Sequence, residues 1–172
     1  MFTNNQIALE NLPRIENLEL LGIASKYKTI LVVNRIVGFV GFLIIFLILD
    51  TFVVDESFPV TVFWTITVAW CLVFVLSLVF ADLSFKSRQY GLRDKDITYS
   101  KGVLVHSVTT LPFNRIQHVE ISRTFLARKF GLATLHLYSA GQNGSDLSIK
   151  GLPFEVAQSL KTFLTNKLNE QS

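Results

Sequence analysis

Three histidines are the side chains in this sequence best suited to bind a metal ion or to transfer a proton. His106, His118 and His136 fall on three different predicted strands. A catalytic metal site would require them to converge on one face and to leave one coordination position open. His118 and His136 instead lie on the polar face of alternating segments, which is typical of histidines exposed on a strand. The pattern therefore predicts no metal ion and no cofactor.

Two serines and an aspartate resemble parts of a hydrolase. However, Ser139, Ser145 and Asp146 lack the Gly-x-Ser-x-Gly turn that presents a nucleophilic serine between a strand and a helix. Gly141 and Gly144 lack the spacing and the following helix of a phosphate-binding loop. The segment is more simply a polar hairpin turn, and we expect the protein not to be an enzyme.

A basic cluster surrounds a predicted helical turn at residues 124–130. Its basic residues are Arg123, Arg128 and Lys129, and its apolar residues are Phe125, Leu126 and Phe130. Such a turn can enter the headgroup layer of a membrane while its basic residues pair with lipid phosphates. Alternatively, the apolar side chains seat the turn on the domain and the charges remain solvated. The three basic residues are candidate lipid-binding or partner-binding residues.

Arg115 belongs to a second distinctive stretch, which continues through Gln117 and His118. An arginine and a glutamine at the start of a strand can hydrogen-bond neighbouring loop carbonyls and stabilise the domain without any ligand. Arg115 could instead act as a forked donor to a phosphate or to a partner carboxylate. It is the fourth candidate binding residue, and the sequence leaves both roles open.

Two apolar spans precede these residues and must determine where they lie. Residues 29–81 contain only four of the 29 charged residues of the chain. Within them, residues 58–81 are uncharged and would form a helix of about 36 Å, longer than the roughly 30 Å hydrocarbon core of a bilayer. Residues 29–49 form the other span. We therefore expect a transmembrane helical hairpin with an acidic loop at residues 50–57.

Arg35 is the one charged residue inside the first span. An arginine at the centre of a membrane costs roughly 2.5–3.5 kcal/mol on insertion scales, whereas one near a helix end can extend its guanidinium to the headgroups at lower cost. We expect Arg35 to extend to the headgroups. The alternative is a functional charge within the membrane.

The charges flanking the spans predict the orientation of the hairpin. Lys26 and Lys28 precede the first span, Lys86 and Arg88 follow the second, and the connecting loop contains three acidic residues and no base. The positive-inside rule then places both termini of this multi-pass protein in the cytoplasm. Residues 1–28 form a cytoplasmic or interfacial segment, either a helix on the membrane surface or a partly disordered tail.

Residues 82–172 predict a small β domain, because apolar and polar residues alternate in short segments separated by turns. The expected strands are residues 83–92, 97–100, 103–111, 116–122, 133–139 and 147–149. Residues 154–169 change to the spacing of an amphipathic helix. Its apolar residues are Val156, Leu160, Phe163, Leu164 and Leu168. Because a small antiparallel barrel leaves an apolar end open, we expect this C-terminal helix to cap it.

Four runs in this region resemble a known family. They are YGLRDKDITYSKGVL (residues 90–104), PFNRIQHVEIS (112–122), FGLATLHLYSAG (130–141) and LSIKGLPF (147–154). Their order and the two preceding spans are similar to the bacterial pleckstrin-homology-like (PH-like) domain of the YdbS type, formerly a domain of unknown function. The resemblance covers residues 83–168 and implies a PH-like barrel without an established activity or cofactor. Members often occur beside a longer relative with repeated PH-like modules, which implies a partner of that kind.

The charge distribution favours a membrane over nucleic acid as a partner. Residues 86–172 carry 12 Lys and Arg against 6 Asp and Glu, a balance suited to anionic headgroups. No zinc-finger spacing or aromatic RNA-binding signature accompanies these bases. The leading hypothesis is a non-enzymatic, membrane-anchored scaffold that binds a protein partner and anionic lipid. The alternative is a subunit of a membrane enzyme or transport complex that uses the hairpin, with Asn34 and Arg35 as intramembrane polar groups.

Overall fold

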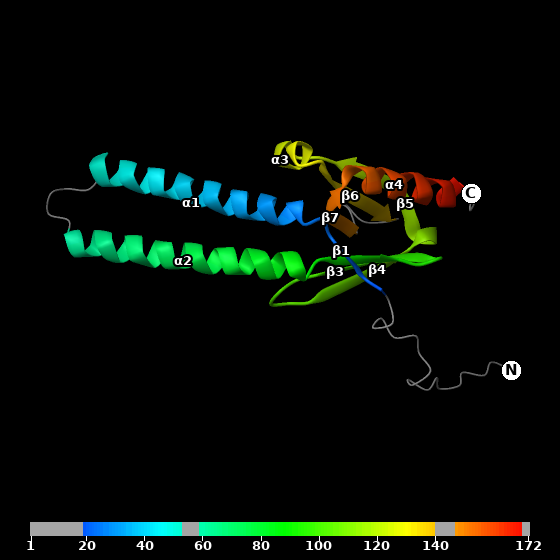
Figure 1. Ribbon diagram of the computed structural model, residues 1–172, viewed down its shortest axis with the longest axis horizontal. Coiled ribbons are helices and arrows are strands. Elements are labelled where there is room, and N and C mark those ends of the chain that lie inside the picture. Colours follow the sequence, from blue (N-terminus) through cyan, green and yellow to red (C-terminus); the bar gives the residue numbers. More distant parts are fainter. Residues whose placement is uncertain (1–18, 53–58, 140–146, 170–172) are drawn as a thin grey trace, which may run out of the picture.

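The chain folds into a long helical hairpin and a β domain at one end of it (Figure 1). The structure is a computed structural model, and it describes residues 19–52, 59–139 and 147–169. The two helices run side by side away from the β domain, so that both enter it at the same end (Figure 1). This arrangement makes one end of the domain proximal to the hairpin and the other end distal.

The hairpin consists of α1 (Lys26–Phe52) and α2 (Val60–Lys86), each 27 residues or about 40 Å long. Aromatic rings pack between the helices: Phe39 stacks on Phe74 at 4.2 Å between ring centroids, and Phe42 stacks on Trp70 at 3.9 Å. The outward faces carry exposed Val, Leu and Ile side chains. With mean hydropathies of 2.5 and 2.4 over their most apolar windows, both helices are long and apolar enough to cross a membrane.

The second helix extends further than the sequence predicts. Residues 83–86 continue α2 and residues 87–88 connect it to the sheet, whereas we expected a strand over residues 83–92, so that expectation is wrong for its first six residues. The ion pair between Asp82 and Lys86, at the favourable i, i+4 spacing, contributes to the stability of this additional turn. It ends at Ser87, whose backbone N–H donates to the Leu83 carbonyl. The strand β2 then comprises only Gln89–Leu92.

The first sheet has four antiparallel strands in the order β1-β2-β3-β4. Its strands β3 (Asp96–Lys101) and β4 (Ser107–Pro112) form the meander expected after β2. The strand β1 (Leu21–Gly22) was not expected: it precedes the hairpin and pairs with residues 89–90 of β2. Residues 21–22 are therefore extended rather than helical, while residues 1–18 of the expected N-terminal segment lie outside the described residues.

The second sheet contains β5 (Ile116–Ser122), β6 (Leu132–Ser139) and β7 (Leu147–Pro153), paired antiparallel in that order. A single 3₁₀ turn, η3 (Phe113–Arg115), connects the two sheets. The short helix α3 (Phe125–Lys129) lies between β5 and β6, where the sequence predicts a helical turn. The predicted strand at residues 147–149 is extended to Pro153, and the polar turn expected at residues 141–146 lies outside the described residues.

The C-terminal helix α4 (Phe154–Asn169) covers the apolar interior between the sheets. Its buried residues are Ala157 and Leu164, with Leu160 and Leu168 partly buried beside them. Val156 and Phe163, which we expected in the same stripe, are more exposed. The inward-facing core also contains Ile97, Tyr99, Leu111, Phe113, Ile116, Val119, Leu135, Leu137, Ile149 and Leu152. Two antiparallel sheets closed by a C-terminal helix constitute a PH-like fold, as predicted.

Candidate functional site

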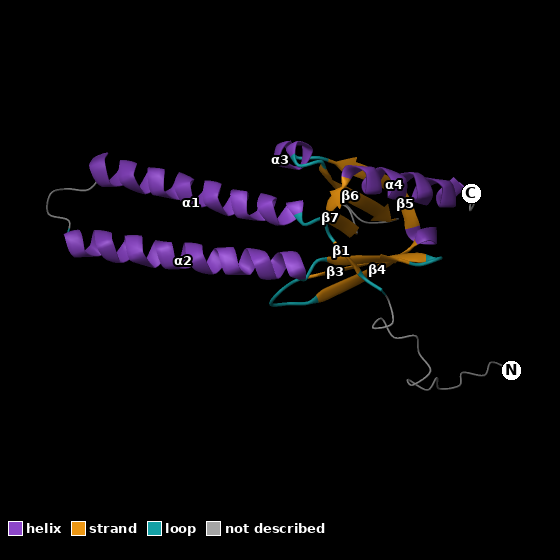
Figure 2. Cartoon of the chain, viewed as in Figure 1, coloured by secondary structure: helices purple, strands orange, loops and turns teal. Residues whose placement is uncertain are grey.

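The hairpin-proximal end of the domain collects the features that could meet a membrane. Strand register defines this end: Gln89, three residues after α2, pairs with Ser100 near the end of β3. The β3–β4 loop (residues 102–106) and α3 therefore lie near the hairpin, whereas the β2–β3 turn and η3 lie at the distal end (Figure 2). Each candidate residue can be assigned to one of the two ends.

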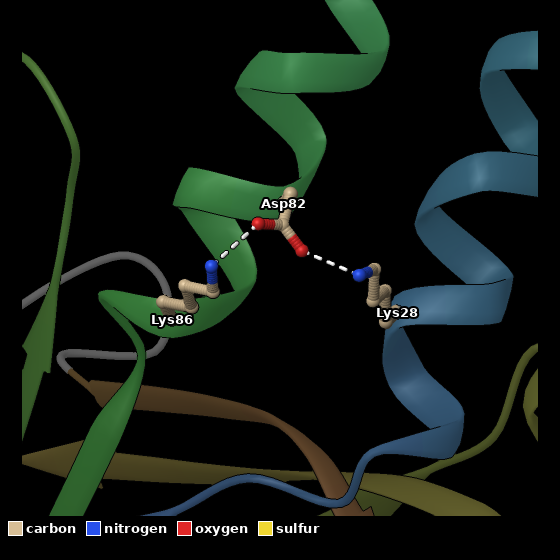
Figure 3. Close-up of polar contacts among 3 residues, drawn as sticks. All are labelled: Lys28, Asp82 and Lys86. Atoms are coloured by element: carbon tan, nitrogen blue, oxygen red, sulfur yellow. Dashed lines mark ion pairs between the residues drawn. The ribbon is translucent and has the colours of Figure 1, made fainter.

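Ion pairs join the two helices where they leave the domain (Figure 3). The Asp82 carboxylate on α2 lies 2.5 Å from Nζ of Lys28 on α1 and 2.8 Å from Nζ of Lys86. Asp82 thus pairs with one lysine from each helix, and these three side chains together carry a net charge of +1. The Lys28–Asp82 ion pair therefore links α1 to α2 where the helices meet the domain.

The first turn of α1 is built into the β domain. The Ala24 backbone N–H donates to the Gly151 carbonyl of β7 at 3.0 Å. The ring of Tyr27 packs on the backbone of Gly151, and the Arg88 guanidinium lies 5.8 Å from the centroid of that ring. Arg88 also donates from Nη1 to the Tyr99 hydroxyl at 3.2 Å. The hairpin and the domain are thus connected by non-covalent contacts between their residues as well as by the covalent backbone.

A second, smaller apolar cluster continues this connection to α3. Ile30 of α1 packs with Ala127 of α3 and with Leu132 of β6, and all three are buried. Leu126 and Phe130 pack against the cluster from the same turn. The apolar face of the basic turn is therefore used to seat it on the domain and on α1.

The three basic residues of the turn have different surroundings. The Arg123 guanidinium stacks 4.1 Å from the centroid of the Phe154 ring and donates to the carbonyls of Leu132 at 3.2 Å and Arg128 at 3.3 Å. Arg128 and Lys129 are exposed. Arg123 is therefore committed to contacts within the domain, while the side chains of the other two are accessible to a ligand.

Phe125 makes the turn resemble a membrane-facing element. Its side chain is 72% exposed at the start of α3, a large apolar surface to leave in water. Thr124 fixes the turn, because its side-chain oxygen accepts from the Ala127 backbone N–H at 3.3 Å as an N-cap. The turn thus presents one aromatic and two basic side chains outward at the proximal end.

Arg115 lies at the other end of the domain. It is exposed in η3, directly after the Asp96–Pro112 pair that ends the first sheet on its distal side. The structure therefore brings Arg123, Arg128 and Lys129 together at α3 and leaves Arg115 apart from them, in η3. The four candidate residues cannot form one binding site.

His118 and His136 both lie beside Tyr138, at 5.7 and 6.5 Å between ring centroids, while His106 lies between two strands of the other sheet. On the second sheet, His136 bonds Ser122 Oγ through Nε2 and Ser148 Oγ through Nδ1, both at 2.8 Å. We expected His106 on a strand, but it lies in the loop before β4. Its Nε2 atom forms a hydrogen bond with Ser100 Oγ at 2.7 Å. Over residues 19–52, 59–139 and 147–169, no three His, Cys, Asp or Glu side chains are placed to hold a metal ion.

Arg35 lies beside a small cavity of about 240 Å³ between α1 and α2. The cavity is lined by Asn34, Arg35, Gly38 and Phe39 of α1 and by Trp70, Val73, Phe74 and Ser77 of α2. Arg35 is exposed and is seven residues from Lys28, about 10 Å along the helix axis. Because Cα–Cβ bonds in a helix tilt toward the N-terminus, the Arg35 side chain starts in the direction of the proximal end. This direction favours an extended side chain that reaches the headgroups.

Sequence reasoning missed the residues of the junction. Tyr27, Asp82, Arg88 and Gly151 act together only because α1 and β7 meet in the fold. The Asp82–Lys86 spacing was the one local signal, since an i, i+4 acid–base pair favours a continued helix. The other contacts join residues far apart in the sequence and have no local signature.

Comparison with known proteins agrees with this architecture. The family model described as a bacterial PH domain matches residues 29–168, which includes both helices of the hairpin. None of the curated proteins compared with the chain matches it significantly. The crystal structure, at 2.00 Å resolution, of a DUF1696 family protein with a pleckstrin-homology domain from Shewanella loihica PV-4 is similar over 47% of this chain and 70% of that one, at 18% identity and a TM-score of 0.37. On the family match, this chain belongs to the bacterial PH domain family.

Proposed function

We propose that this protein is a non-enzymatic integral membrane protein that holds its PH-like domain at the cytoplasmic face of the bacterial inner membrane, where the domain binds a protein partner and anionic lipid. The observation that carries the proposal is the junction: two helices long enough to span a bilayer enter the same end of the domain. Tyr27 packs on Gly151 of the domain, and Lys28 pairs with Asp82 of the other helix. A domain held in this way stays within a few ångströms of the headgroups.

The basic turn is the proposed lipid contact. Arg128 and Lys129 are exposed at the proximal end beside Phe125, where each base near an anionic leaflet contributes about 1 kcal/mol. This interaction is too weak to recruit a free domain. It is sufficient to enrich anionic lipids around a domain that the hairpin already holds at the membrane, because tethering raises the effective concentration.

The distal end is the proposed protein-binding side. Arg115 is exposed there, on the surface that faces away from the hairpin, and its guanidinium can form a forked pair with a partner carboxylate. A longer relative with repeated PH-like modules is the kind of membrane partner that we propose. The separation of Arg115 from the basic turn allows lipid and protein to bind simultaneously.

Spin-labelled lipids test the lipid contact. The full chain in vesicles should immobilise spin-labelled phosphatidylglycerol in preference to phosphatidylcholine, and Arg128→Glu with Lys129→Glu should reduce that preference. The matched control is Lys95→Glu with Lys161→Glu, since these exposed bases lie in the distal turn and along α4. An equal preference in all three proteins would contradict the lipid contact.

In-cell photocrosslinking tests the protein contact. A photoreactive residue at position 115 should crosslink to one membrane protein in a defined product, and one at position 128 should crosslink to lipid. If instead a known pump or synthase is captured from the outer faces of α1 and α2, for example from position 68, the hairpin is the contact surface. The protein would then be a subunit of that complex, and the cavity beside Asn34 and Arg35 would be its functional feature.

A further inference from the structure

The most exposed large apolar side chains among the described residues are Leu104 and Val105, in the loop between β3 and β4. They are 86% and 80% exposed, more than any apolar residue on the outer faces of the hairpin. Two adjacent aliphatic side chains at a loop tip are unfavourable in water and favourable at a lipid interface. Their exposure therefore requires an explanation that the core of the domain does not supply.

The loop lies at the proximal end, next to α2. The last pair of the β3–β4 ladder is Lys101 with Ser107, and the neighbouring Ser100 pairs with Gln89, three residues beyond the end of α2. Figure 1 shows the β3–β4 loop extending past the end of α2, in the direction in which the two helices leave the domain. The level of the tip is therefore that of the ion pairs at Asp82, where the headgroups of a spanned membrane would lie.

The shape of the loop is well defined. Gly102 has a φ of +111°, and a Cβ at this position would lie 1.9 Å from the Val105 carbonyl oxygen, so only glycine fits. The Ser100 hydroxyl and the His106 ring close the base of the loop with a 2.7 Å hydrogen bond. A closed loop presents Leu104 and Val105 outward without an ordering cost when they meet a membrane.

We propose that Leu104 and Val105 insert into the lipid interface on the domain side of the hairpin. The inference rests on the proposed function, since it requires the hairpin to span a bilayer. Phe125 on α3 is the matching apolar contact on the other flank, because α3 and the loop lie on opposite sides of the hairpin in Figure 1. With the two helices, these contacts hold the domain at a fixed tilt, so that its distal end always faces the cytoplasm.

Spin-label depth measurements on the full chain in lipid nanodiscs test the insertion. In a Cys71→Ala background, single labels are placed by Leu104→Cys, Leu92→Cys and Val68→Cys. Leu92 is the matched control, an apolar residue 41% exposed next to the distal turn, and Val68 is an outward-facing residue of α2. The label at position 104 should collide more with oxygen and less with a water-soluble nickel chelate than the label at position 92.

The three labels separate the two proposals. A label at position 104 that is as accessible to the nickel chelate as that at position 92, while position 68 is protected, overturns the insertion alone. A label at position 68 that is itself accessible overturns the membrane-spanning hairpin, and the proposed function with it.

A second experiment leaves positions 104 and 105 free of the label, because a label at position 104 replaces one of the side chains proposed to insert. The label is moved to Lys101, at the base of the loop, and is measured with and without Leu104→Asp and Val105→Asp. Because both side chains are exposed, the double variant retains the fold, which circular dichroism verifies. The nickel collision rate at position 101 should rise at least twofold in the double variant, and an unchanged rate overturns the proposal.

Discussion

Gly151 of β7 lies against the ring of Tyr27 in α1 so closely that a Cβ at position 151 would lie 2.6 Å from the ring's Cγ atom. Gly151 also has a φ of +81°, a backbone conformation that favours glycine. The absence of a side chain in the middle of a strand thus makes room for the first turn of a helix that leaves the domain. The contact makes the hairpin and the barrel one mechanical unit.

We expect Gly151→Ala to lower the thermal unfolding midpoint of the full chain in detergent. The substitution adds a backbone penalty of about 1–2 kcal/mol at positive φ and a steric clash with Tyr27. The control is Gly131→Ala, where φ is +70° and nothing lies within 4 Å of the added Cβ, so only the backbone penalty applies. Equal midpoints for the two variants would show that Tyr27 moves freely, and Tyr27→Ala should partly rescue Gly151→Ala.

Replacement of Asp82 by asparagine should loosen the first turn of α1. The variant removes the carboxylate that pairs with both Lys28 and Lys86 and leaves two like charges facing each other. We expect faster amide hydrogen exchange in residues 26–30. Added salt should slow this exchange in the variant, because it screens the repulsion between the lysines, and should speed it in the wild type, because it weakens the ion pairs. Asp50→Asn, at the other end of α1, is the control and should leave this exchange unchanged.

The helix α4 should tolerate a new charge on its exposed face but not on its buried face. Leu164 is 1% exposed in the core, so Leu164→Asp buries an unpaired carboxylate at a cost of several kcal/mol, comparable with the whole stability of a small domain. Thr165→Asp places the same charge on the exposed face. Loss of cooperative unfolding is expected for the first variant alone. A normal transition in both would refute the burial of this face.

Substitution of Arg123 should lower the stability of the domain, whereas substitution of Arg128 should weaken only its contact with anionic lipid. Arg123→Ala removes a cation–π contact and two hydrogen bonds to carbonyls, a combined loss of about 1–3 kcal/mol. Arg128→Ala should leave the unfolding midpoint within about 0.5 kcal/mol of wild type and reduce only the preference for anionic lipid. A destabilised Arg128→Ala protein would indicate that this side chain, too, has a structural role.

Reporter fusions check the orientation. A fusion that ends after Thr51 should be active with a reporter that requires the periplasm, and one after Asn169 with a reporter that requires the cytoplasm. The expectation follows from the bases that flank the hairpin on its proximal side. If each fusion were active only with the other reporter, the membrane orientation would be the reverse of the one we expect, and the domain would lie outside the cytoplasm.

The elements with a strong local period could be predicted from the sequence, and those defined by distant contacts could not. The amphipathic spacing of residues 154–169 predicted α4 with the correct bounds, and Gly131 correctly marked the end of α3. The strand β1 is only two residues long, with both side chains exposed, so no alternation reveals it. It exists because β2 offers an unpaired edge next to it.

The candidate site shows the same division. The grouping of Arg123, Arg128 and Lys129 is local and was predicted, whereas the stacking of the Arg123 guanidinium on Phe154 depends on the start of α4 lying beside it in the fold. Leu104 and Val105 were read as part of a strand over residues 103–111, because their apolar character suits a strand as well as a membrane. Only their position at a loop tip distinguishes the two.

The order of β1 and β2 in the sheet has a consequence for biogenesis. These neighbouring strands are separated in sequence by the entire hairpin, so in the proposed orientation the first strand emerges from the ribosome long before its partner. The two can meet only after α1 and α2 have both been integrated, with both ends returned to the same side of the bilayer. Closure of the first sheet therefore requires both spans to be inserted, and a chain with a single inserted span leaves the edge of β2 unpaired and open to association with another chain.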